Sequence, residues 1–168
     1  MAYPLFRVEG SNTSSTSCAV TLPPHSSGQQ LLVFAAQDNG GTAISASGSW
    51  TSVVTQGQSG ACRGAVFRLE ATGSAETLTL SSSTNAPWAY VAIVLPDVLS
   101  ATPVDGWQRT DWNAVSTADT TSVAASSNSG SAITASEAGC LALVMWCSDN
   151  GVAFSGPFIR APMSDMIE

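Results

Sequence analysis

The most distinctive hydrophobic pattern in the chain is a run of six apolar residues at positions 31–36. Gly28 precedes the run, and the turn-forming sequence Asp38-Asn39-Gly40 follows it. A strand with one solvent-exposed face alternates apolar and polar residues, and helices are usually longer than six residues. The run therefore predicts a strand buried on both faces. Residues 91–95 and 141–147 are apolar on both parities as well, and such faces favour assembly with a partner over a lone monomer.

Alternating patterns predict half-buried strands elsewhere. In residues 17–22, Cys18, Val20 and Leu22 share one face, and the residues between them share the other. Further strands are predicted at residues 50–55, 61–70 and 77–81, and apolar runs predict strands at 88–95 and 140–147. Residues 3–9 could be a first strand or an extended arm, followed by a polar linker at residues 10–15. Almost no helix is indicated. Many short strands separated by turns predict an all-β fold, an antiparallel, jelly-roll-like β-sandwich.

The chain also contains an internal similarity. A shift of 111 positions places Gly28 on Gly139, Leu32 on Leu143, and residues 38–40 on residues 149–151. We therefore expect one domain, residues 1–168, built from two pseudo-repeated halves. The first half spans about residues 11–97, a linker spans about 98–130, and a partial second half spans about 131–168. Because the second half lacks counterparts of the later strands, we expect a neighbouring chain to complete it, or the chain to be a fragment of a longer protein.

Composition and charge narrow the class of protein. The 168 residues are 44% hydrophobic and only 10% charged, which is not the composition of a disordered chain. The formal net charge is −7 and no lysine is present, which argues against nucleic-acid or membrane-surface partners. No secretory signal and no membrane-spanning apolar run is evident, so we expect synthesis in a cytosol.

Few residues are suited to catalysis or metal binding. His25 is the only histidine, and the four cysteines lack the spacing of metal ligands, so we expect no metal site, no cofactor and no enzymatic activity. We expect His25 to be a solvated loop residue rather than a general base. The cysteines are best interpreted as buried or half-buried thiols, with a disulfide such as Cys18–Cys62 as the alternative.

One cluster combines acidic and aromatic residues: Asp105, Trp107, Asp111 and Trp112. Tryptophan rings can stack on sugars while carboxylates hydrogen-bond to them, so these four residues are the candidate glycan-binding site. Paired carboxylates can also hydrolyse glycosides. A third interpretation, which we favour, is that the tryptophans cover a sheet face or a subunit contact.

The order of these segments resembles a group of tailed-bacteriophage virion proteins. The resemblance covers about residues 11–151, and its matching positions are Leu22-Pro23, residues 28–40, Trp50-Thr51, residues 63–68, residues 77–81 and residues 89–95. It implies a β-sandwich module of tails, fibres or capsid decorations, and it carries over no catalytic residues.

These observations lead to one functional hypothesis and one alternative. We expect a structural component of a bacteriophage particle, located in the virion and made in the host cytoplasm. Its partners would be other virion proteins and further copies of itself. The alternative is a receptor- or carbohydrate-binding module that recognises a host-surface glycan.

Overall fold

The computed structural model describes residues 6–38, 43–53, 57–59, 62–73, 75–95, 141–143 and 160–162. Within these ranges the chain forms strands and turns without any helix, so the predicted all-β class is confirmed. No helix that could cross a membrane occurs in the described ranges.

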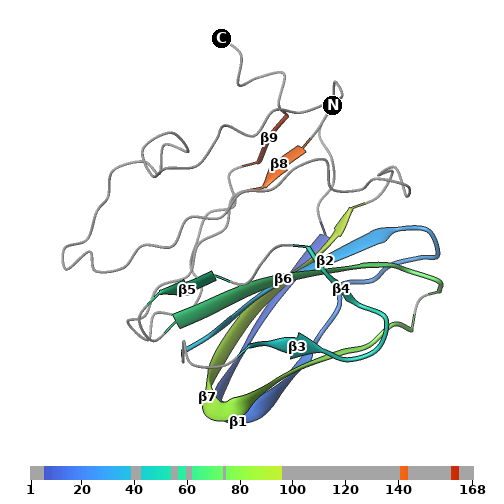
Figure 1. The fold of residues 1–168 in the computed structure, drawn as a ribbon. Helices are drawn as coiled ribbons and strands as arrows, with labels where there is room; N and C mark the ends of the chain where they lie inside the picture. The colour runs from blue at the N-terminus through green and yellow to red at the C-terminus, as the bar shows by residue number, and fades with distance from the viewer. Residues whose placement is uncertain are drawn as a thin grey trace.

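Seven strands form one antiparallel sheet (Figure 1). They are β1 (Phe6–Val20), β2 (Gln30–Gln37), β3 (Ser45–Ala46), β4 (Thr51–Ser52), β5 (Gly57–Ser59), β6 (Cys62–Glu70) and β7 (Leu78–Leu95). The main order is β1-β7-β2-β6-β4, while β3 pairs with β7 and β5 pairs with β6. Two short strands, β8 (Leu141–Leu143) and β9 (Arg160–Pro162), pair with each other in a separate sheet.

Strand β2 lies at the centre of the large sheet and is buried along its whole length. Phe34 pairs with Val66 of β6 and with Val91 of β7, so both edges of β2 are hydrogen-bonded. Leu31, Val33 and Ala35 belong to one core cluster, and Leu32 and Phe34 belong to a second cluster on the other face. The predicted strand buried on both faces is confirmed. Since the isolated chain already buries both faces, they do not by themselves require a second protein.

Strands β1 and β7 are longer than the sequence pattern predicted. The predicted polar linker at residues 10–15 is wrong, because β1 runs through it. Likewise, the separate strands predicted at residues 77–81 and 88–95 are parts of one strand. Serine and threonine continue the ladder because strand pairing uses main-chain groups, and two register shifts between Asn12 and Ser17 absorb the irregular pairing.

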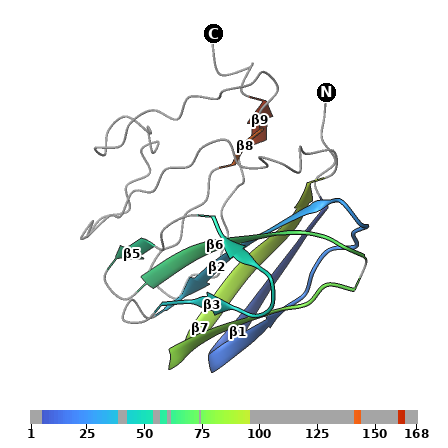
Figure 2. The same cartoon turned by 45° about the vertical axis from the view of Figure 1, so that its right-hand side comes forward.

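The large sheet curves around the first core cluster (Figure 2). Leu78 and Leu80 from the start of β7 pack in the same cluster as Tyr90 and Val94 from its other half. The Tyr90 hydroxyl accepts a hydrogen bond from the backbone N–H of Thr21 at 2.9 Å, which ties the curved strands together. The cluster is completed by residues from β1, β2 and β6 and from the connections, among them Ile44 and Trp50.

The finer predictions extend beyond the described residues. Of the predicted second half, residues 131–168, the structure describes only β8 and β9. The pseudo-repeat, the domain bounds and the jelly-roll-like sandwich therefore stay predictions. The strand predicted at residues 61–70 is confirmed by β6, while within the predicted strand at 50–55 the described strand is the two-residue β4.

Candidate functional site

Two connections meet at one end of the large sheet. Residues 21–29 join β1 to β2, and residues 71–77 join β6 to β7. The backbone N–H of Gly28 donates to Ala71 O at 2.7 Å, and the Ala71 N–H donates to Gln29 O at 2.9 Å. Gly28 has a φ of 84°, a conformation that glycine adopts without steric cost. These bonds hold the two connections side by side.

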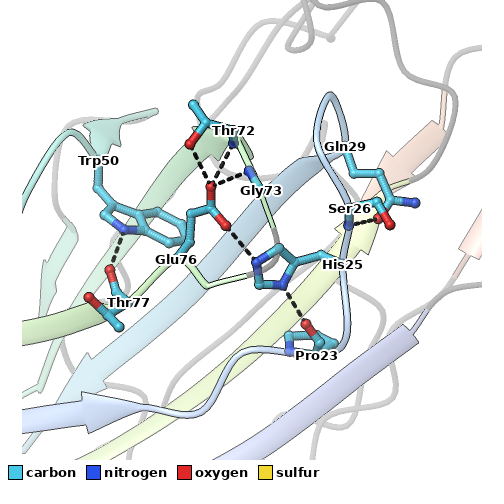
Figure 3. A network of polar contacts seen from close by, with 9 residues as sticks. All are labelled: Pro23, His25, Ser26, Gln29, Trp50, Thr72, Gly73, Glu76 and Thr77. Carbon is cyan, nitrogen blue, oxygen red and sulfur yellow. Dashed lines mark hydrogen bonds and ion pairs between the residues drawn. The ribbon is translucent and has the colours of Figure 1, made fainter.

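His25 is enclosed between these connections (Figure 3). Its side chain is 4% exposed, so the predicted solvated histidine is wrong. The ring Nδ1 lies 2.7 Å from the carbonyl oxygen of Pro23, and Nε2 lies 2.8 Å from Glu76 Oε2. Glu76 is distant in sequence, and no spacing rule links it to His25. The sequence pattern therefore held no signal for this contact.

Glu76 accepts hydrogen bonds at both carboxylate oxygens. Oε2 faces His25, while Oε1 accepts from the Thr72 backbone N–H at 2.6 Å, the Thr72 hydroxyl at 3.0 Å and the Gly73 N–H at 2.9 Å. Desolvation raises the pKa of this carboxyl, but the hydrogen bonds from His25, Thr72 and Gly73 outweigh it and lower the pKa to about 2. An ionised Glu76 can only accept, as can Pro23 O. The hydrogen bond between the two side chains is therefore donated by the Nε2–H of His25.

Two neighbouring hydrogen bonds extend the network. The indole Nε1–H of Trp50 donates to Thr77 O at 3.1 Å, and the Ser26 N–H donates to Gln29 Oε1 at 2.8 Å (Figure 3). Trp50 is also a member of the first core cluster. The network thus links the polar end of the sheet to its hydrophobic core.

The geometry of His25 and Glu76 is suited to holding the two connections together rather than to proton transfer. A general base needs a ring nitrogen that can reach a reacting group, and both nitrogens of His25 already face acceptors within the fold. In the described part of the chain, no group of three or more His, Cys, Asp or Glu side chains could hold a metal ion. The contact between His25 and Glu76 therefore stabilises the packing of the two connections against each other.

Buried glutamines at both ends of β2 were not predicted. Gln37 donates through Nε2 to the Ser82 hydroxyl at 2.7 Å and to Thr84 O at 3.0 Å, and Gln30 donates to Glu70 Oε2 at 3.3 Å. Both glutamines are 1% exposed, and their Oε1 atoms have no hydrogen-bond partner among the described residues. The sequence signal was available, since these two residues directly flank the run at 31–36.

The remaining predicted residues have mixed outcomes. Cys18 is a free, buried thiol, which confirms the favoured interpretation for this cysteine. The alternative, a disulfide between Cys18 and Cys62, is therefore wrong. Burial raises the pKa of the Cys18 thiol. The candidate glycan-binding residues lie outside the described residues and stay predictions: Asp105, Trp107, Asp111 and Trp112.

Comparisons with protein-family models, with curated proteins and with solved structures found no match. The basis for assigning a function is thus the sequence pattern together with the geometry of the described residues.

Proposed function

We propose that the chain is a structural component of a tailed-bacteriophage particle, a capsid decoration, fibre or tail protein that acts through protein–protein contacts. In this proposal it folds as a jelly-roll-like β-sandwich and assembles in the virion after synthesis in the host cytoplasm. The resemblance of residues 11–151 to virion modules supports the proposal from the side of the sequence.

The observation that carries the proposal is the edge strand β1. It is 15 residues long, and within the described residues it pairs with β7 alone. No described strand lies along its outer side, where its main-chain N–H and C=O groups could pair with another strand. Long edges of this kind are templates for pairing with another chain. A protein that functions by making contacts has a use for such an edge.

The polar groups of the described part support the same conclusion. His25 and Glu76 are committed to joining two connections, as shown by their 4% and 10% exposed side chains. A net charge of −7 without lysine favours protein partners over nucleic acid or a membrane surface. Both observations agree with a role that depends on contacts instead of chemistry.

Mass spectrometry of gradient-purified particles tests this proposal. We expect peptides of this chain in particles of the phage that encodes it, in amounts comparable to other multi-copy structural proteins. Detection in the infected-cell lysate together with absence from purified particles would overturn the proposal. The alternative, a glycan-binding module, depends on the tryptophans at 107 and 112, and no described contact favours it.

A further inference from the structure

We propose that a second copy of this chain pairs with the outer edge of β1, antiparallel and centred on Val8. The result is a twofold dimer in which the large sheets of both copies become continuous through their first strands. The pairing deepens the assembly role proposed above and rests on it for the biological setting. If the chain does not dimerise in solution, this pairing is wrong, but the presence of the chain in the phage particle is still decided separately by mass spectrometry of purified particles.

The first part of β1 is regular enough to accept another strand. From Phe6, opposite Val94, to Asn12, opposite Trp88, it pairs with β7 without a register shift. Natural sheets protect their edges with charged side chains, above all lysine, with proline or with bulges. Residues 6–12 contain neither lysine nor proline, and the register shifts of β1 begin only after Asn12. The charged residues of this segment are Arg7 and Glu9, which are opposite in sign, so residues 6–12 are the part of the edge suited to pairing with a strand of complementary charge.

The charges on this segment are complementary to themselves. Arg7 and Glu9 are two residues apart, lie on the same face and form an ion pair at 2.5 Å, with side chains 49% and 43% exposed. In an antiparallel pair of identical strands centred on Val8, Arg7 lies opposite Glu9 of the second copy. Twofold symmetry repeats this contact with the two chains exchanged. Two cross-strand ion pairs thus form on one face, and no like charges meet.

The other face of the same segment brings an aromatic ring over a glycine. Phe6 is 55% exposed, and among the described residues it is the one large hydrophobic side chain that is exposed. The same register places it opposite Gly10 of the second copy. Glycine is required at position 10, because a Cβ there would collide with the ring and hydroxyl of Tyr90. The Tyr90 ring thus fills the space over Gly10, and Phe6 of the second copy would lie beside that ring, where two aromatic side chains can pack together.

Charge-reversal variants distinguish the ion pairs between two copies from the Arg7–Glu9 ion pair within one chain. The Arg7→Glu variant carries acidic side chains at both positions, and the Glu9→Arg variant carries basic side chains at both. Each variant loses the internal ion pair, and each should form a homodimer that is weaker by roughly tenfold or more. An equimolar mixture should form a heterodimer, because every cross-strand pair is then opposite in charge. Native mass spectrometry resolves the three species by mass.

The matched controls are Thr13→Glu and Thr13→Arg, which place the same charges on an exposed residue of β1 beyond the paired segment. We expect these variants to dimerise like the original chain, with no preference for the mixed species. A chain that stays monomeric at near-millimolar concentration, or reversed variants that mix statistically, would overturn the pairing.

Hydrogen exchange on the unmodified chain provides a second measurement that needs no variant. Amide protection within residues 6–10 should rise with protein concentration, while protection of the central strand β2 should stay constant. Protection of residues 6–10 that is independent of concentration, in a sample whose mass shows dimer, would place the contact elsewhere and contradict the proposal.

Discussion

His25 Nε2 lies 2.8 Å from Glu76 Oε2, and this contact between residues 51 positions apart in the sequence joins two connections of the sheet. Each partner is also held by local hydrogen bonds, His25 by Pro23 O and Glu76 by the N–H groups of Thr72 and Gly73. Together with the backbone hydrogen bonds that join Ala71 to Gly28 and Gln29, this contact fixes the end of the sheet.

Removal of His25 should destabilise the fold. A His25→Ala substitution removes the polar contacts of the imidazole with the Pro23 carbonyl and with Glu76 Oε2 in a nearly closed environment, so we expect a loss of several degrees in Tm. Thermal unfolding followed by circular dichroism measures this loss. Ser27→Ala, at an exposed residue of the same connection, is the control and should leave Tm unchanged.

The contribution of Glu76 should depend on pH in the acid range. Its pKa is lowered from 4.5 to about 2 in the folded chain, so its stabilising effect is fully present above pH 4.5. That effect is lost as the pH falls from 4.5 towards about 2, because the unfolded chain then binds the proton first. Urea unfolding of the original chain and of Glu76→Gln should differ at neutral pH, and the difference should shrink at about pH 3. A constant difference across this range would show that the carboxylate charge is not involved.

A pair of phenylalanine substitutions, one in β2 and one in β1, tests whether the face of β2 that carries Phe34 is buried in the single chain. Phe34 is 6% exposed in the second core cluster, whereas Phe6 is 55% exposed. Phe34→Ala should lower the free energy of unfolding by about 3–5 kcal/mol. Phe6→Ala, in dilute monomer, should change it by less than about 0.5 kcal/mol. Equal effects in chemical denaturation would mean that the second face is not buried in the single chain.

Gly10 should not tolerate a methyl group. Gly10→Ala places a Cβ against the Tyr90 hydroxyl, which also accepts the hydrogen bond from Thr21, so we expect a cost of about 1–3 kcal/mol. Gly73→Ala is the control, since a Cβ there meets no atom within 4 Å. Similar denaturation midpoints for both variants would contradict the close approach of Tyr90 to β1.

Local patterns predicted the parts of the fold that depend on local burial. The run at residues 31–36 predicted β2, and the alternation of Cys18 and Val20 predicted the buried positions at the end of β1. The pattern failed at residues 10–15, because polar side chains at the margin of a sheet look like those of a linker. Strand pairing through main-chain groups is invisible to a hydropathy pattern.

The site was less predictable than the fold. His25 looked solvated because its partner Glu76 is brought close only when β6 and β7 are in place. The buried ends of β2 could have been found, since Gln30 and Gln37 flank the apolar run directly. The predicted glycan-binding group around Trp107 and Trp112 lies outside the described residues and stays a prediction.

The proposal that this chain is part of a phage particle can be checked by a reconstruction of the purified particle at a resolution that traces individual strands. We expect repeated copies of this fold in the particle, with residues 6–10 of β1 beside the same residues of a neighbouring copy. A fully traced particle whose protein subunits do not include this chain would contradict it.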